Sequence, residues 1–268
     1  MPIKLIALDL DDTLLDSKLA VSPRAHDAIR QAVARGVTVT IATGRMYRSA
    51  LPYARQLGLD VPLITYNGAL IKSSLSEETL FHQPIKTELA DQVLSLCRER
   101  GWYVQNYVND ELYVRELDEY ANYYSRMSGV PAIAVGDRLY DGRQSPTKML
   151  VMAGKEDIGK IYDTFKAVFG PRLSIVTSKP TFIEITDPAA NKGRALAFLA
   201  DKLQVKQEEV MALGDSGNDI EMLKYAGWGV AMGNASAAVK AVARLETLGN
   251  DADGVAEAIE KYVLASEG

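Results

Sequence analysis

The sequence is poor in cysteine, histidine and aromatic residues. Of its 268 residues one is cysteine and two are histidine, and aromatic residues make up 7%. The single thiol, Cys97, excludes a disulfide framework and favours a reducing, cytoplasmic setting. Cys97 falls in a helical pattern, where we interpret it as a small buried hydrophobe. Neither His26, in another helical pattern, nor His82, just before a proline, is predicted to take part in chemistry.

The chain also lacks an excess of positive charge and a long apolar run. Lys and Arg number 30 against 35 Asp and Glu, and the resulting net charge of −5 argues against a general nucleic-acid binder. No apolar run approaches the length of a membrane span, and the segment from Met1 to Lys4 leads directly into a strand, with no room for a signal peptide. No phosphate loop of the nucleotide-kinase type is present. We therefore expect neither nucleic acid nor membrane as a partner.

The most informative segment that is present is the apolar run at 3–8 with the acidic residues after it. The run predicts a buried strand of a parallel sheet, so Asp9 and Asp11 follow its carboxyl end, where open α/β sheets bind ligands. Alternation along an extended chain would point both carboxylates to one side, where they repel each other unless a cation lies between them. A hard, oxygen-liganded ion such as Mg2+ suits this pair. The alternative is a solvated acidic turn.

A second strand, at 37–42, also ends in polar residues. Thr43 and the backbone N–H of Gly44 are suited to bind a phosphoryl oxygen, and Arg45 adds positive charge nearby. Taken alone, the Thr-Gly pair is an ordinary turn.

Lys192 lies just ahead of a helical pattern that places Leu196, Leu199 and Leu203 on one face. The N-terminus of a helix favours an anion, so Lys192 there adds to a suitable phosphate site. Taken alone, Lys192 would be a surface lysine.

The strand at 210–214 ends in a further acidic loop, which is followed by a helix predicted from about 220 to 226. Asp215 can share one cation with Asp9 and Asp11, and Asn218 can orient a phosphate or carboxylate oxygen. Three strand ends and one helix start therefore carry residues suited to bind a phosphate group and a cation.

In this order the four segments resemble the motifs of the haloacid dehalogenase superfamily of phosphohydrolases: Asp9-x-Asp11-x-Thr13, Thr43-Gly44-Arg45, Asn191-Lys192-Gly193 and Gly214-Asp215-Ser216-x-Asn218-Asp219. Over essentially its whole length the chain is most similar to the Cof-type sugar-phosphatase branch. Tyr66-Asn67-Gly68-Ala69 and the segment 231–235 add to this resemblance. Asp12 stands where glycine is common in the branch, which we interpret as tolerated because aspartate suits turns.

The resemblance implies a phosphatase mechanism. Asp9 would attack phosphorus and become an aspartyl-phosphate, and Asp11 would protonate the leaving alcohol and later activate water. Mg2+ would be held by Asp9, the backbone carbonyl of Asp11, and Asp215. The phosphoryl oxygens would be bound by a backbone N–H near Leu10 and by Thr43, Gly44, Lys192 and Asn218. Asp219 would orient Lys192 or the waters of the metal.

The pattern of elements predicts two domains. Strand and helix alternate up to about residue 83, including a helix from Pro23 to Arg35 with Ser22 as its N-cap, which indicates βαβ units. Between 84 and 187 a helix followed by two strands occurs three times, with helices at 87–100, 117–127 and 156–168 and strands near 102–108, 111–115, 132–136, 147–153, 173–178 and 181–186. We thus expect an α/β, Rossmann-like core of mostly parallel sheet at 1–83 and 188–268. The inserted α+β segment, 84–187, resembles a type IIB cap.

The resemblance implies hydrolysis of small phosphomonoesters, such as sugar phosphates, flavin mononucleotide or pyridoxal phosphate. The alternatives are a phosphomutase or phosphotransferase that uses the same aspartyl-phosphate, and a non-enzymatic sensor of phosphorylated ligands. Specificity is expected to reside in the cap, where seven aromatic residues can stack on a ligand or simply pack: Trp102, Tyr103, Tyr107, Tyr113, Tyr120, Tyr123 and Tyr124. The sequence does not specify the substrate or the oligomeric state.

Overall fold

The computed structural model of the protein describes residues 2–142 and 144–265, and the chain divides into two compact units. The larger unit combines Met1–Phe81 with Asn191–Gly268, and His82–Ala190 forms the inserted unit. The inserted unit thus begins two residues before the position expected from the sequence and ends three residues after it. Each unit has its own sheet, and each is described separately below.

The larger unit is built on a parallel five-stranded sheet with the order β14-β13-β12-β1-β2. Its strands are β1 (Leu5–Leu8), β2 (Thr38–Ile41), β12 (Val210–Gly214), β13 (Trp228–Ala231) and β14 (Leu245–Glu246). Because β1 lies between β12 and β2 and is buried on both faces, it is apolar throughout. Leu5 pairs with Val210 on one side and Thr38 on the other, so the carboxyl ends of β1, β2 and β12 meet at one edge of the sheet.

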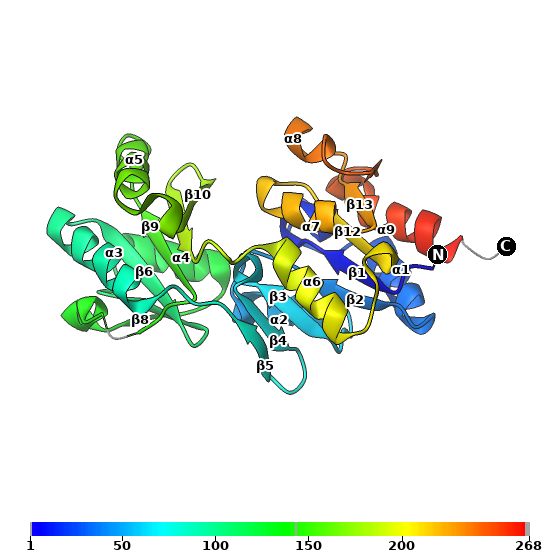
Figure 1. Ribbon diagram of the computed structural model, residues 1–268, viewed down its shortest axis with the longest axis horizontal. Helices are drawn as coiled ribbons and strands as arrows, with labels where there is room; N and C mark the ends of the chain where they lie inside the picture. The colour runs from blue at the N-terminus through cyan, green and yellow to red at the C-terminus, as the bar shows by residue number, and fades with distance from the viewer. Residues whose placement is uncertain (1, 143, 266–268) are drawn as a thin grey trace. The chain divides into compact units, whose positions relative to one another are not determined.

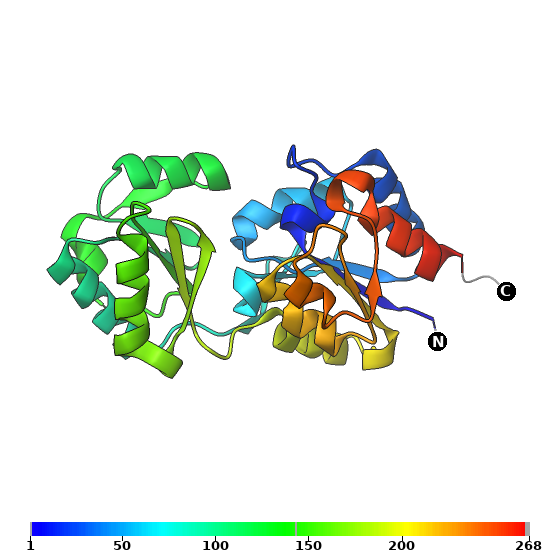
Figure 2. The same ribbon diagram turned by 90° about the horizontal axis from the view of Figure 1, so that it is seen from above.

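Helices cover both faces of this sheet (Figure 1). They are α1 (Pro23–Ala34), α2 (Tyr47–Gln56), α6 (Lys192–Lys202), α7 (Ile220–Tyr225), α8 (Ala237–Lys240) and α9 (Gly254–Ile259). Figure 2 shows α9, in red, and α1, in blue, on one side of the strands, and α6 and α7, in yellow and orange, on the other. Leu5 and Ala7 of β1 lie in one buried cluster with α6 and α7. The predicted α/β core with a mostly parallel sheet is therefore confirmed.

Two of these helices can be compared with the patterns in their sequences. Ser22 accepts a hydrogen bond from the N–H of Ala25 at 3.0 Å and caps α1, as its sequence pattern predicts. In α6, Leu196 and Leu199 are buried, but Leu203 lies just past the last turn and is 37% exposed. The prediction that Leu203 shares the buried face is thus wrong, because the helix ends before it.

A small antiparallel sheet follows β2 in the chain. It has the order β3-β4-β5 and consists of β3 (Pro62–Thr65), β4 (Leu70–Ser73) and β5 (Thr79–His82). A parallel bridge between Ala42 and Ile64 joins it to the end of β2. This bridge brings the loop after β3 to the edge of the main sheet where the polar residues lie.

The inserted unit contains a six-stranded mixed sheet with the order β10-β11-β9-β6-β7-β8. The strands are β6 (Tyr103–Val108), β7 (Glu111–Val114), β8 (Ala132–Ala134), β9 (Lys148–Met152), β10 (Ser174–Lys179) and β11 (Phe182–Thr186). The helices α3 (Thr87–Arg100) and α5 (Ile158–Phe169) pack on one face, and α4 (Glu119–Ser128) contacts the other through Tyr124. Cys97 is buried between α3 and the sheet, as predicted. No helix among the described residues has the length and apolar character needed to span a membrane.

Candidate active site

The polar residues predicted at the ends of β1 and β12 come together in the larger unit. Asp9 directly follows β1, is extended (φ −65°, ψ 157°) and continues the alternation of Leu5 and Ala7, whose side chains face α6. The N–H of Asp9 donates to the carbonyl of Leu213 at 3.1 Å, which aligns the two strand ends. The carboxylate of Asp9 therefore points toward the first residue of α6, Lys192.

Lys192 is fully buried and pairs with two carboxylates. Its Nζ donates to Oδ1 of Asp9 at 2.6 Å and to Oδ1 of Asp219 at 2.6 Å. Burial lowers the pKa of Lys192, but the charges of Asp219 and Asp9 outweigh it, so the net shift is upward and the side chain is charged. An ammonium group has three N–H donors, and these two bonds use two of them.

Asp219 organises the loop after β12. Its Oδ2 accepts from the backbone N–H groups of Asp215 and Ser216, each at 3.0 Å, while its Oδ1 accepts from Lys192. The side chain of Asp219 also lies against Gly214, where a Cβ would come within 2.5 Å of it. Both oxygens of Asp219 are thus engaged in holding the loop and the lysine.

Asp215 lies beside this cluster and is bound by Thr13. The Oγ1 of Thr13 donates to Oδ1 of Asp215 at 2.8 Å, which links the loop after β1 to the loop after β12. We assigned no role to Thr13 from the sequence. Its position two residues after Asp11 in the first motif was the available signal.

The cluster carries an excess of negative charge that suits a divalent cation. Carboxylate oxygens of Asp9, Asp215 and Asp219 all lie within 4.8 Å of one another, and Lys192 supplies a single positive charge among them. Burial, together with the neighbouring carboxylates, raises the pKa of Asp9 well above its usual range. Burial also raises the pKa of Asp215 to about 6. Oxygen ligands with two uncompensated charges fit a divalent cation such as Mg2+, and the cluster of Asp9, Asp215 and Asp219 could hold one.

Asp11 does not point into this cluster. Its side chain forms a two-point salt bridge with Arg45, whose Nε donates to Oδ2 at 2.9 Å and whose Nη2 donates to Oδ1 at 2.6 Å. The side chains of Asp9 and Asp11 therefore have different partners, Lys192 and Arg45, and a cation shared by Asp9 and Asp11 stays a prediction. The strand ends at Leu8, and Asp11 lies in an irregular turn, η1 (Leu10–Leu14), so strand alternation does not extend to it.

Thr43, Gly44 and Asn218 border the same edge of the sheet. Thr43 is buried, and its Oγ1 accepts from the N–H of Arg45 at 3.2 Å. A Cβ on Gly44 would lie 2.9 Å from Oδ1 of Asn67, so a larger residue there would displace the amide of Asn67. The same Oδ1 accepts from Nδ2 of Asn218 at 2.9 Å. Asn67 thus lies against two predicted phosphate ligands, Gly44 and Asn218, a role that the sequence pattern at 66–69 does not specify.

The backbone of Leu10 begins η1 immediately after Asp9. The residue at position 12, where the branch usually has glycine, adopts a left-handed conformation (φ 58°). Asn234 supports this turn by donating from its Nδ2 to the carbonyl of Asp12 at 2.8 Å. The loop that carries Asp9 and Asp11 is therefore held by a segment more than 200 residues later in the chain.

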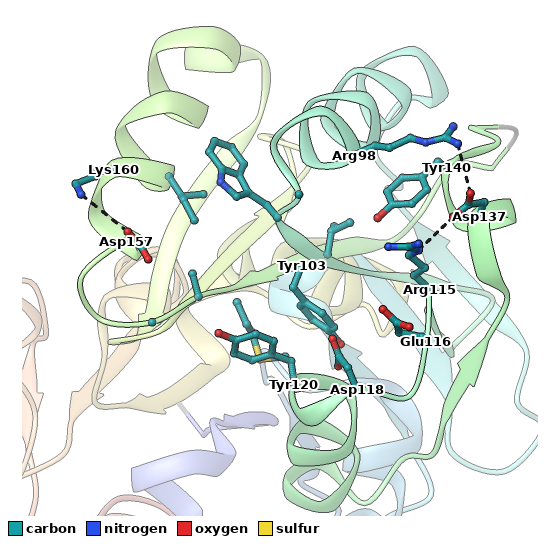
Figure 3. A pocket seen from close by; sticks show the side chains of 17 residues that line it. Arg98, Tyr103, Arg115, Glu116, Asp118, Tyr120, Asp137, Tyr140, Asp157 and Lys160 are labelled. Carbon is teal, nitrogen blue, oxygen red and sulfur yellow. Dashed lines mark hydrogen bonds and ion pairs between the residues drawn. The ribbon is translucent and has the colours of Figure 1, made fainter.

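The inserted unit contains a separate open cavity of about 600 Å³ (Figure 3). Arg98 and Arg115 reach Asp137 at 3.5 and 3.1 Å on one side of it. Three of the seven aromatic candidates line the cavity, namely Trp102, Tyr103 and Tyr120, and the last two have ring centroids 5.2 Å apart. The other four do not line it: Tyr107 and Tyr124 are buried against each other, Tyr113 packs against the core of the unit, and Tyr123 is exposed.

Comparisons with known proteins agree with this geometry. The family model of haloacid dehalogenase-like hydrolases matches residues 6–259. The chain is 35% identical over 267 residues to the 5-amino-6-(5-phospho-D-ribitylamino)uracil phosphatase YcsE of Bacillus subtilis, covering 98% of this chain and 96% of that protein. A haloacid dehalogenase-like hydrolase from Bacteroides thetaiotaomicron has a similar structure, with a TM-score of 0.89, 30% identity, and coverage of 97% and 99% of the two chains.

A solved structure also supports the subclass. The subclass IIB sugar phosphatase BT4131 matches with a TM-score of 0.80 and 25% identity, over 97% of this chain and 98% of that one. The inserted mixed sheet is thus the cap sheet of a subclass IIB structure. The chain belongs to the haloacid dehalogenase-like hydrolases and, within them, to the Cof-type phosphatases, which hydrolyse phosphoric monoesters.

Proposed function

We propose that this chain is an Mg2+-dependent phosphatase that hydrolyses small phosphorylated metabolites through an aspartyl-phosphate on Asp9. The observation that carries the proposal is the buried cluster in which Asp9 and Asp219 share Lys192, with Asp215 beside them. A ligand-binding protein does not require a carboxylate oriented by a buried lysine at the end of a buried strand. A phosphatase requires this arrangement, because the nucleophile must approach an anionic phosphoryl group.

In the first half of the reaction, an oxygen of Asp9 attacks phosphorus and the bond from phosphorus to the leaving oxygen breaks. Asp11 gives its proton to that oxygen, so the product leaves as an alcohol. Lys192 neutralises charge on the phosphoryl oxygens, while Thr43, the N–H groups near Leu10 and Gly44, and Asn218 bind them. Mg2+ held by Asp9, Asp215 and the carbonyl of Asp11 would supply further positive charge beside the phosphoryl group.

In the second half, Asp11 removes a proton from water as the water attacks phosphorus. The bond between phosphorus and the oxygen of Asp9 breaks, and inorganic phosphate is released. Asp219 keeps Lys192 and the loop after β12 in place throughout, through the hydrogen bonds that its two oxygens accept. The protein returns to its starting state with Asp11 protonated.

The substrate class within this proposal is a small phosphomonoester, such as a sugar phosphate, flavin mononucleotide or pyridoxal phosphate. Support comes from relatives named for a phosphorylated ribitylaminouracil and for sugar phosphates. We assign recognition of the leaving group to the inserted unit, and the location of the enzyme to the cytoplasm, since its one thiol is buried and unpaired.

The test is a phosphatase assay of wild type and Asp9→Asn on a panel of these esters. We expect Mg2+-dependent release of phosphate from wild type and none above background from Asp9→Asn. A parallel assay with an acceptor sugar separates the classes, because a phosphotransferase would form a new sugar phosphate in place of inorganic phosphate. Turnover that persists in Asp9→Asn would remove the proposed nucleophile.

A further inference from the structure

A salt bridge fixes the side chain of Asp11. Nε and Nη2 of Arg45 donate to Oδ2 and Oδ1 of Asp11 at 2.9 and 2.6 Å, so both oxygens face one planar guanidinium group. We propose that Arg45 is a positioning residue, which sets the direction from which Asp11 exchanges its proton with the leaving group and then with water. The inference rests on the proposed function, in which Asp11 is the acid and base.

Asp11 needs such a partner because its surroundings do little to orient it. Its side chain is 49% exposed, and its backbone lies in the irregular segment η1, followed by the left-handed Asp12. A carboxylate in this position can occupy several rotamers, and a small misplacement of an acid or base lowers its efficiency greatly. A two-point contact with a guanidinium defines both distance and plane, which a single hydrogen bond does not.

Arg45 is itself held in one position, unlike most exposed arginines. Its side chain is 19% exposed, its Nη1 lies 3.3 Å from the hydroxyl of Tyr53, and its Cζ lies 5.1 Å from the centre of that ring. Its backbone N–H is fixed by Thr43. Tyr53 on α2 therefore fixes the side chain of Arg45, and Arg45 in turn fixes the side chain of Asp11.

The guanidinium leaves room for chemistry on Asp11. Each carboxylate oxygen has two lone pairs, and the salt bridge uses one on each oxygen. The second lone pair of either oxygen can bind a proton, which the resulting O–H group gives to the leaving group and which the carboxylate takes back from water. Arg45 therefore restrains the side chain of Asp11 without occupying every site on it.

This role predicts a dependence on the leaving group. An alkoxide is a poor leaving group and needs a proton from Asp11, whereas p-nitrophenolate leaves without one. Loss of Arg45 should therefore slow the first turnover of an alkyl phosphate far more than that of p-nitrophenyl phosphate. A residue that binds the phosphoryl group would instead affect both esters alike, because they share that group.

The experiment compares full-length wild type, Arg45→Gln, Arg45→Lys and Arg55→Gln in the presence of Mg2+. Arg55 is the matched control, since it lies on α2, pairs with Glu77 at 3.8 Å and is 65% exposed. Leaving-group release in the first turnover is measured with glycerol 3-phosphate and with p-nitrophenyl phosphate. We expect Arg45→Gln to lose ~30-fold or more on the alkyl ester and less than ~3-fold on the aryl ester, given the usual share of general acid catalysis. Arg45→Lys keeps the charge but not the two-point contact, so its loss on the alkyl ester should lie between those of wild type and Arg45→Gln. Arg55→Gln should match wild type on both esters.

Two further variants make the outcome decisive. Tyr53→Phe removes the hydroxyl contact to Arg45 and should show the same preference for the aryl ester at smaller size, with an unchanged melting temperature. Asp11→Asn should show the largest preference of all. Equal losses on both esters in the Arg45 variants, while Asp11→Asn still favours the aryl ester, would overturn the positioning role alone. Equal losses in Asp11→Asn, or activity in Asp9→Asn, would instead contradict the proposed function.

Discussion

Each of the two units buries a lysine, and the two lysines differ in the charge around them. In the larger unit Lys192 contacts Asp9 and Asp219 at 2.6 Å each, with Asp215 close by. In the inserted unit Lys148 lies 3.5 Å from Glu184 and 4.9 Å from the centre of the Tyr107 ring. Among the residues that the structure describes, the first lysine lies near three carboxylates, and the second pairs with Glu184.

The difference separates a site that needs a further cation from a pair that is already neutral. A buried one-to-one pair balances its own charge and fixes the packing around it. A buried cluster with two uncompensated negative charges is unfavourable unless a cation or protons are added, and such clusters occur where chemistry is done. We therefore expect substitutions in the two places to affect different properties.

The largest expected effect is on catalysis at Asp9. Asp9→Asn keeps the shape of the side chain and removes the nucleophile, so kcat should fall by roughly four powers of ten or more. Glu184→Gln in the inserted unit is the matched change and should reduce kcat on p-nitrophenyl phosphate by less than ~10-fold. Steady-state assays with far-UV circular dichroism check both variants. An Asp9→Asn protein with a tenth of wild-type activity would contradict the assignment of Asp9 as the nucleophile.

The second prediction concerns the replacement of each buried lysine by methionine. Lys192→Met should lower kcat by ~100-fold or more, because charge on the phosphoryl group loses a buried partner. Lys148→Met should mainly destabilise the fold, by about 3 kcal/mol, because it leaves the charge of Glu184 without its lysine. Chemical denaturation and activity are measured on both. A stability loss confined to Lys192→Met and an activity loss confined to Lys148→Met would reverse the interpretation.

The third prediction concerns pH and Mg2+. The pKa of Asp215 is raised to about 6 and that of Asp9 also lies above its usual range, both chiefly through burial. A carboxyl with a raised folded-state pKa favours folding fully below its unfolded pKa of ~3.9, and this contribution disappears as pH rises through about 6. Mg2+ competes with these protons, so it should raise the melting temperature more at pH 8 than at pH 5.

Differential scanning fluorimetry with and without Mg2+ at each pH measures this shift directly. Asp215→Asn should lose most of the Mg2+ effect at pH 8, while Glu184→Gln should retain it, since Glu184 belongs to the neutral pair. A rise in melting temperature that is equal at both pH values would argue against the acidic cluster as the metal site.

The smallest expected effect is on a left-handed residue of each unit. Asp12 (φ 58°) and the exposed Asn109 (φ 52°) both adopt a conformation that costs alanine about 1 kcal/mol. Asp12→Ala should lower stability by this amount and also reduce kcat, because it disturbs the loop that holds Asp9 and Asp11. Asn109→Ala should lower stability only. Asp12→Gly should be as stable as wild type, and a clear loss there would mean that the aspartate side chain itself is needed.

The elements of both units were largely predictable from the sequence because their patterns are local. The strand that precedes Asp9, the Ser22 cap and the three repeats of helix and two strands each depend on neighbouring residues. The short helix η3 (Gly136–Tyr140) was not predicted, because its single buried residue, Leu139, produces no repeating pattern of hydrophobic residues.

The contacts between side chains could not be predicted, because they join residues far apart in the chain. The salt bridge of Arg45 with Asp11 spans 34 residues, and the bond between Asn218 and Asn67 spans 151. The motif spacing indicated Asp11 as acidic and close to Asp9, but its direction depends on the irregular turn and on Arg45. The sequence pattern therefore indicated which polar residues gather at one edge of the sheet, and only the fold defined which charges neutralise each other.

The central claim is that the charge excess around Lys192 serves a nucleophilic Asp9, and the most direct test is to trap the phosphoryl group. Wild type is mixed with substrate and Mg2+, quenched in acid within the first turnover, digested and analysed by mass spectrometry. We predict one phosphoryl group on Asp9, absent without Mg2+, absent in Asp9→Asn and retained in Glu184→Gln. A phosphoryl group on any other residue, or product release in a first turnover that leaves no peptide phosphorylated at any time, would contradict the account.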